Sequence, residues 1–159
     1  YRAIAGVDEV GVGPLAGPVV AAAVILPDEA HLPQLNDSKK LSPSARETLA
    51  SLIREQAVAW AIGEVSPEEI DRINVYQASL EAMRRAVLGL ATPADYLCVD
   101  ARTIPGVAIP QLAIIKGDAK DASIAAASIV AKVYRDRLMC ELDQKYPGKG
   151  GYVVRSPHA

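Results

Sequence analysis

The chain has 159 residues, of which half are hydrophobic and 23% are charged, and its formal net charge is −2. This length and composition are typical of one folded domain over residues 1–159 and exclude a disordered chain. A small negative charge lacks the basic excess that nucleic-acid-binding proteins usually carry. The apolar run over residues 17–26 is too short to span a bilayer, so we expect a cytoplasmic protein without membrane association. We also expect a monomer.

The charge is unevenly distributed along the chain. Residues 1–115 hold 9 Lys or Arg against 14 Asp or Glu, whereas residues 116–159 hold 8 against 5. The net charge therefore passes from −5 in the first part to +3 in the second. Such an excess is equally compatible with ordinary solvated helix faces and with a surface that binds phosphates.

The first apolar segment, residues 4–8, ends in two adjacent acids and runs into a glycine-rich turn. Neighbouring side chains on a strand point to opposite faces, so a buried strand cannot leave both Asp8 and Glu9 on the surface. Gly11 and Gly13 permit backbone conformations that are closed to other residues and expose peptide N–H groups to a ligand. Taken alone, an Asp-Glu pair before such a turn is more often the solvated end of a strand than a catalytic site.

Two further acids favour a functional site. Asp100 ends the apolar segment 96–100, and Asp118 follows the apolar segment 112–115. Residues at the strand ends of an α/β sheet converge on a crevice where ligands bind. Clustered carboxylates bind hard divalent cations through oxygen. The sequence therefore predicts that Asp8, Glu9, Asp100 and Asp118 form a metal site.

The rest of the chain alternates predicted strands and helices. Residues 18–26 are apolar without alternation, which predicts a strand that is buried on both faces. Prolines, Asn36 and Asp37 predict a loop over residues 27–41. The remaining expected elements are helices that begin at Ser42-Pro43, at a capping box on Ser66 and at Asn74, a helix over residues 120–144, and strands over residues 58–65, 96–100 and 111–115.

Two helices carry informative patterns. The helix from Asn74 has apolar residues at spacings of three and four, which indicate core packing, whereas Arg84 and Arg85 fall on a solvated face. The residues of this stripe are Tyr76, Leu80, Met83, Val87 and Leu90. Residues 122–128 are almost all small and allow close approach of the backbone. We expect the alanines to pack tightly on the sheet. For Ser123 two interpretations stay open, packing on the sheet and a position in a nucleic-acid groove.

Four separated motifs carry a family resemblance. They are Ala5-Gly6-Val7-Asp8-Glu9-Val10-Gly11, the run from Gly13-Pro14-Leu15 to Pro27, Asn36-Asp37-Ser38-Lys39-Lys40-Leu41, and the segment from Lys116-Gly117-Asp118 to Ala131-Lys132. In this order they resemble bacterial ribonuclease HII from about residue 4 to residue 146. The resemblance implies an α/β, ribonuclease-H-like fold, with a five-stranded mixed sheet flanked by helices.

The resemblance also implies an activity. It indicates an endonuclease that cuts the RNA strand of RNA–DNA hybrids, and single ribonucleotides embedded in duplex DNA, with two Mg²⁺ or Mn²⁺ ions. The four acids would hold these ions, and the products would carry 3′-hydroxyl and 5′-phosphate ends. The peptide groups of Gly11, Val12 and Gly13 are placed to read the 2′-hydroxyl. Lys39 is a candidate phosphate contact, and Tyr152 is the candidate for the tyrosine with which the family probes its substrate.

Two departures from the family pattern keep an alternative open. Val12 stands where the family carries arginine between the two glycines, so a side-chain contact to phosphate is lost. After residue 147 we expect the family's final helix to be missing. The alternative is a hybrid-binding protein with weak or no nuclease activity. A sugar kinase of the actin-like group has no support, because the sequence holds no second phosphate loop.

Overall fold

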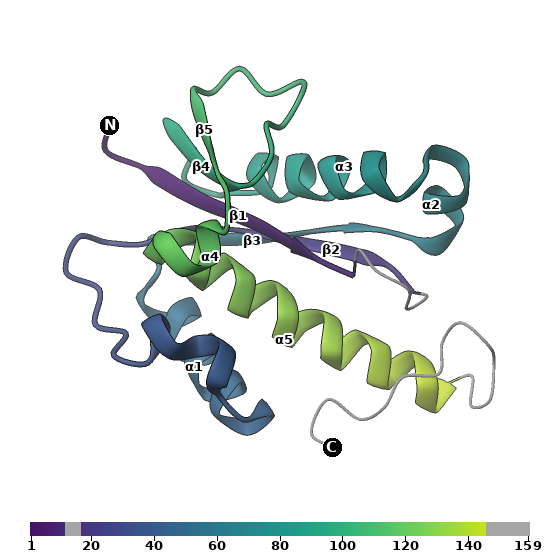
Figure 1. Cartoon of the computed structure of the whole chain (residues 1–159), viewed down its shortest axis with the longest axis horizontal. Helices are drawn as coiled ribbons and strands as arrows, with labels where there is room; N and C mark the ends of the chain where they lie inside the picture. Colours follow the sequence, from purple (N-terminus) through teal and green to yellow (C-terminus); the bar gives the residue numbers. More distant parts are fainter. Residues whose placement is uncertain (12–16, 146–159) are drawn as a thin grey trace.

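A computed structural model of the chain describes residues 1–11 and 17–145, and Figure 1 shows its arrangement. Within these residues five strands form one mixed sheet in the order β3-β2-β1-β4-β5. The strands are β1 (Ile4–Val10), β2 (Val19–Ile25), β3 (Ala59–Val65), β4 (Tyr96–Asp100) and β5 (Gln111–Ile114). β1 pairs antiparallel with β2 and parallel with β4, and β4 pairs parallel with β5. The predicted five-stranded mixed sheet is confirmed.

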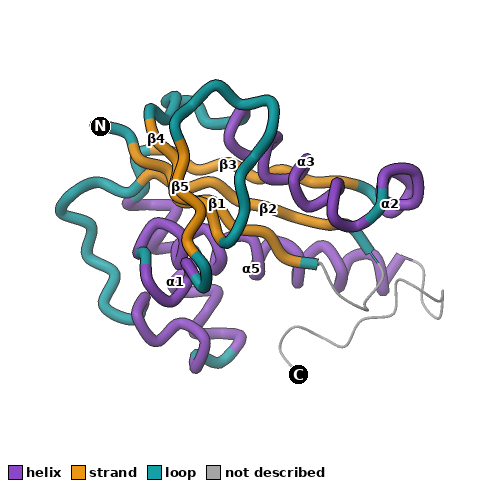
Figure 2. The backbone as a smooth tube through the Cα atoms, turned by 45° about the horizontal axis from the view of Figure 1, so that its top comes forward, coloured by secondary structure: helices purple, strands orange, loops and turns teal. Residues whose placement is uncertain are grey.

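Helices cover both faces of this sheet. They are α1 (Pro43–Gln56), α2 (Pro67–Ile73), α3 (Val75–Leu88), α4 (Gly117–Lys120) and α5 (Ala122–Lys145), with a 3₁₀ helix η1 (Leu35–Lys40). α3 lies on one face, whereas α1 and α5 lie on the other (Figures 1 and 2). Two apolar clusters fill the space between the sheet and these two layers of helices. β2 contributes to both clusters and is buried along its whole length, as its unbroken apolar run predicts.

Predicted helix starts are confirmed where the capping residues are local in sequence. Ser42 Oγ accepts a hydrogen bond from the Ala45 N–H at 3.2 Å, with Pro43 in the first helical turn. Ser66 and Glu69 form the reciprocal capping box of α2. Such caps satisfy N–H groups that have no partner within the helix, which is why a few residues suffice to predict them.

Two features differ from the prediction. β1 continues to Val10, so Asp8 and Glu9 lie inside the ladder opposite Ala22 and Ala21 instead of after it. The predicted loop 27–41 contains η1, a short 3₁₀ connector that buries Leu35 and Ser38.

The predicted helix over residues 120–144 is confirmed as α5, but it begins two residues later, because the chain is extended at Asp121 (φ −130°, ψ 125°) between α4 and α5. Asp121 Oδ1 accepts from the Ile124 N–H at 2.9 Å and caps α5. The core stripe of α3 is correct for Leu80, Met83, Val87 and Leu90, which are buried, but wrong for Tyr76, which is 56% exposed.

No helix within residues 1–11 and 17–145 has both the length and the apolar character needed to cross a membrane.

The sheet and α5 approach each other closely at Gly6. A Cβ atom at Gly6 would overlap the backbone of Ser123 and Ile124 at the start of α5. The absence of a side chain here therefore allows the helix to lie directly on β1, two residues before Asp8. This contact explains why small residues occupy the first turns of α5.

Gly6→Ala should lower the free energy of unfolding by more than about 3 kcal/mol, because backbone atoms of α5 would have to move. Urea unfolding measures this loss. Gly89→Ala is the matched control, since the nearest atom to its new Cβ would be the Arg85 carbonyl oxygen at 3.2 Å. Equal effects of the two substitutions would contradict the close approach at Gly6.

Candidate active site

Sheet pairing brings the first three acids to one region. Val7 of β1 pairs with Val99 of β4 in a parallel register, so the next residues along the two strands are Asp8 and Asp100. Asp100 Oδ1 accepts a hydrogen bond from the Gly117 N–H at 2.8 Å. This bond holds the start of α4 against the end of β4, and α4 carries Asp118 in its first turn. Electrostatic interactions of Asp8 with all three other acids place the four in one group.

Asp8 is the most buried of the four acids. The residue is only 5% exposed. Burial raises the pKa of Asp8 to about 8, and the nearby negative charges of Asp100, Glu9 and Asp118 add to the rise. One hydrogen bond opposes it, because the Glu9 N–H donates to Asp8 Oδ1 at 2.8 Å. Near neutral pH the site therefore favours a proton or a cation at Asp8.

Glu9 points to the other face of β1, toward α3. Its pKa is raised by burial and by Asp100, and it is lowered by Arg102 and by a hydrogen bond from Ser79. Arg102 Nη1 lies 3.8 Å from Glu9 Oε1. Alternation along the strand explains this split, since consecutive side chains leave on opposite faces.

Lys39 joins the site from η1. Its Nζ lies 2.9 Å from Asp118 Oδ2, although the Lys39 side chain is 72% exposed. This contact with Asp118 raises the pKa of Lys39, with smaller contributions from Asp100 and Asp8. The structure thus brings Lys39 to the acids from a segment that is far away in the sequence. An exposed ammonium group in this position can exchange its partner readily.

The donor set fits hard divalent cations, because all four side chains offer carboxylate oxygens and their charges are in excess. As the side chains stand, no three Asp, Glu, His or Cys residues in the described part of the chain are arranged to hold one ion together. Gly117 and Lys39 contact Asp100 and Asp118 at hydrogen-bond distance, whereas Arg102 lies 3.8 Å from Glu9. Binding of an ion would therefore require Asp100 and Asp118 to turn toward it.

The remaining predicted site residues are placed differently. Gly11 is described and adopts φ +98°, a conformation that favours glycine. Val12, Gly13 and Tyr152 lie outside the described residues. Ser123 is half-buried and lines a cleft of about 440 Å³ with Cys98 and Asn36, among others, and its backbone packs on Gly6.

Sequence reasoning missed three residues that surround the acids and the glycine turn. Arg102 and Ser79 contact Glu9, and the buried Arg135 donates from Nε to the Pro18 carbonyl oxygen at 2.9 Å. A Cβ on Gly11 would lie 2.5 Å from Arg135 Nε, so this guanidinium packs against both ends of the turn. The position of Arg102, two residues after Asp100, is the one local signal that could have drawn attention to it.

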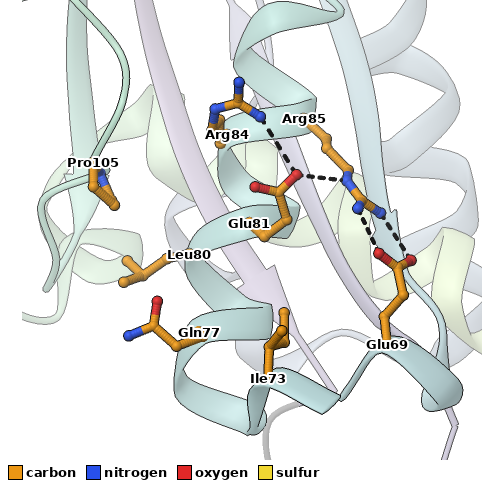
Figure 3. Close-up of a pocket in the computed structure, with 8 residues that line it drawn as sticks. All are labelled: Glu69, Ile73, Gln77, Leu80, Glu81, Arg84, Arg85 and Pro105. Carbon is orange, nitrogen blue, oxygen red and sulfur yellow. Dashed lines mark hydrogen bonds and ion pairs between the residues drawn. The ribbon is translucent and has the colours of Figure 1, made fainter. Parts of the chain in front are cut away.

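A second cavity, of about 370 Å³, lies between α2, α3 and the loop that contains Pro105 (Figure 3). None of the four acids lines it. Arg85 bridges Glu69 at 2.6 Å and Glu81 at 2.8 Å, and Arg84 lies 3.5 Å from Glu81 (Figure 3). Both arginines lie on a partly exposed face, with side chains that are 40% and 37% exposed, and both pair there with acids.

The raised pKa of Asp8 predicts how the stability of the cation-free protein depends on pH. Asp8 has a pKa of about 8 in the folded state and 3.8 as a free side chain, so between these values the folded state binds more protons. The stability that Asp8 contributes is therefore fully present below about pH 4. It is lost as the pH rises toward 8, and the free energy of unfolding falls by at most about 1.4 kcal/mol per pH unit.

Urea unfolding with a chelator present, at several pH values in this window, measures the slope. Asp8→Asn mimics the neutral carboxyl group and should make the slope shallower, leaving a smaller contribution of the same sign from Glu9. The exposed Asp71→Asn is the control. A slope that is the same in Asp8→Asn and in the parent would contradict the burial of a protonated Asp8.

Comparisons with known proteins agree with this geometry. A family model described as Ribonuclease HII matches residues 5–154. Ribonuclease HII of Myxococcus xanthus (strain DK1622) is 62% identical over 148 residues, which cover 92% of this chain and 50% of that protein. The ribonuclease HII of Geobacillus thermodenitrificans is 59% identical over 147 residues, with 92% and 56% covered. The chain thus spans about half the length of the curated relatives that it matches.

Solved structures give the same relationship. The crystal structure of ribonuclease H2 from Pyrococcus horikoshii OT3 has a TM-score of 0.77 at 32% identity and covers 98% of this chain and 82% of that one. RNase HII of Archaeoglobus fulgidus, in its complex with PCNA, has a TM-score of 0.79 at 32% identity, with 97% and 82% covered. Because the family model matches nearly the whole chain, this chain belongs to the ribonuclease HII family.

Proposed function

We propose that this chain is an endonuclease that hydrolyses the RNA strand of RNA–DNA hybrids and cuts at single ribonucleotides within duplex DNA. The observation that carries the proposal is the buried Asp8, whose pKa is raised to about 8 among Asp100, Glu9 and Asp118. Acids that are held this close repel one another when ionised, so a bound cation stabilises their charged form. Membership of the ribonuclease HII family supports the choice of substrate.

Asp8, Glu9, Asp100 and Asp118 would hold two divalent cations, Mg²⁺ or Mn²⁺. Such a pair stabilises the attacking and leaving oxygens of an in-line displacement at phosphorus. The protein would contribute by holding together the elements that carry the acids: the β1 ladder holds Asp8, and the hydrogen bond from the Gly117 N–H to Asp100 holds α4, with Asp118, at the end of β4. No side chain has to act as a nucleophile, so the expected products carry 3′-hydroxyl and 5′-phosphate ends.

Lysines next to the acids provide a phosphate-binding surface in this proposal. Lys39 contacts Asp118 yet stays largely in solvent, so a phosphate oxygen can take the place of that carboxylate. Lys40, Lys116 and Lys120 are exposed and lie within two residues of this ion pair in the sequence. By contrast, Lys132 pairs with Asp136 at 3.0 Å on α5. The basic excess of the second part of the chain is thus partly neutralised away from the site.

Recognition of the ribonucleotide is assigned to the segment that begins at Gly11. The 2′-hydroxyl is the group by which a protein distinguishes RNA from DNA, and peptide groups at a glycine turn can hydrogen-bond to it. The positive φ of Gly11 supports a tight turn at this point. Val12, Gly13, Ser123 and Tyr152 remain predictions as substrate contacts.

Asp8→Asn and Asp100→Asn should each lower the cleavage rate by more than about a hundredfold, because the volume is kept while a charge that binds the cation is removed. Cleavage of a duplex with a single ribonucleotide, with Mg²⁺, with Mn²⁺ and with a chelator, measures the effect. The chelator should abolish cleavage by the parent, and Asp71→Asn should cut at the parent rate.

Near-parental cleavage by either variant at saturating cation would overturn the assignment of the acids. A parent that binds the duplex without cutting it would instead favour a hybrid-binding protein. Val12, in place of the family's arginine, is the residue that would explain this second outcome.

Duplex binding should weaken steeply with salt, because lysines that neutralise phosphates release counterions. In a chelator, the slope of log affinity against log salt should fall by about one unit each for Lys39→Gln and Lys120→Gln. Lys132→Gln is the matched control, since this lysine is already paired with Asp136. A slope that does not change in Lys39→Gln or Lys120→Gln would show that these lysines are ordinary solvated surface.

A further inference from the structure

The chain turns sharply after Asp100 at the end of β4. Ala101 adopts φ 61°, which is uncommon for a residue other than glycine, and its N–H donates to the Ile114 carbonyl oxygen at 2.9 Å. Regular alternation would send the side chain of residue 102 to the same face as Asp100. The left-handed residue reverses this direction, and Arg102 reaches α3 on the opposite face.

Arg102 makes three contacts there. Its Nη1 donates to Oγ of Ser79, a fully buried residue, and lies 3.8 Å from Glu9 Oε1. Its guanidinium carbon lies 5.2 Å from the centroid of the Tyr76 ring. The Arg102 side chain is 24% exposed. A planar guanidinium group can serve two acceptors at once, and the aromatic ring restricts where it can lie.

We propose that Arg102 is a positioning residue for Glu9. Asp8 and Asp100 leave their strands on the α5 face, whereas Glu9 leaves on the α3 face. The hydrogen bond of Asp100 to Gly117 cannot fix Glu9, so a second support is needed on the α3 side. Arg102, anchored by Ser79, provides that support. The inference rests on the proposed function only in taking Glu9 as a cation ligand.

The geometry favours positioning over blocking. The 3.8 Å separation between Arg102 and Glu9 is longer than a hydrogen bond, so the carboxylate oxygens remain able to bind another partner. Arg102 Nη1 donates its hydrogen bond to Ser79 instead. Groups that orient a metal ligand in this way typically contribute ten- to a hundredfold to metal affinity.

The test is calorimetric titration of the chain with Mn²⁺ in the absence of nucleic acid. Arg102→Gln should weaken Mn²⁺ binding by about ten- to a hundredfold. Arg102→Lys keeps the charge but cannot reach Ser79 and Glu9 together, so its affinity should lie between those of the parent and Arg102→Gln. Arg84→Gln removes a more exposed arginine that pairs with Glu81 on α3, and its affinity should equal that of the parent.

A second variant keeps the test valid if Arg102→Gln misfolds. Tyr76→Leu removes the ring that restricts where the Arg102 guanidinium lies and leaves Arg102 in place, and it should also weaken Mn²⁺ binding. Unchanged or tighter Mn²⁺ binding in the variants that fold would overturn the proposal, because Arg102 would then either have no effect on the cation site or compete with the cation.

Duplex binding in a chelator separates positioning from substrate contact. Arg102→Gln should leave this affinity unchanged, and in a chain that cuts, kcat should fall while KM stays constant. Weaker duplex binding with unchanged Mn²⁺ affinity would make Arg102 a phosphate contact and overturn the proposal. A parent that does not cut would contradict the proposed function alone, since the Mn²⁺ titrations would still decide the role of Arg102.

Discussion

Repulsion among acids in a desolvated sheet is the constraint on which the candidate site depends. Asp8 lies inside the β1 ladder, where water cannot reach it well enough to stabilise its charge. Other groups offset the negative charges of the three acids around Asp8. A peptide N–H contacts Asp100, an ammonium group contacts Asp118 and a guanidinium group lies near Glu9. Asp100, Asp118 and Glu9 are thus each contacted by a different kind of donor from a different segment of the chain.

Close packing on both faces makes this arrangement possible. Gly6 lets α5 lie directly on β1, and Gly63 does the same for α3 on β3, since a Cβ there would overlap the Ala82 carbonyl oxygen. Because the helices lie so near the sheet, a side chain as short as Ser79 can reach a strand residue. The close packing of helices on both faces of the sheet therefore allows the acids to be contacted from both faces.

Features with local causes could be predicted from the sequence. The fully buried β2 and the caps at Ser42 and Ser66 all follow from residues that are close together in the chain. The start of α5 at Ala122, two residues later than predicted, also has a local cause, the cap at Asp121.

Features with distant causes could not be predicted. Lys39 meets Asp118 because η1 packs near α4, and no pattern within residues 35–40 specifies that contact. Tyr76 has the spacing of a core residue, yet it lies under Arg102, whose direction depends on one left-handed residue at Ala101. Periodicity describes one element at a time, whereas these pairings depend on how elements meet.

The hydrogen bond from Arg135 to Pro18 joins residues that are 117 positions apart. It anchors the base of the glycine turn to a helix near the end of the described chain. A contact between residues so far apart in the sequence forms only after a large loop has closed. The residues of the turn alone therefore cannot provide it. During synthesis the N-terminal strand leaves the ribosome first. The contact at the base of the turn can therefore form only after the chain has been synthesised as far as Arg135.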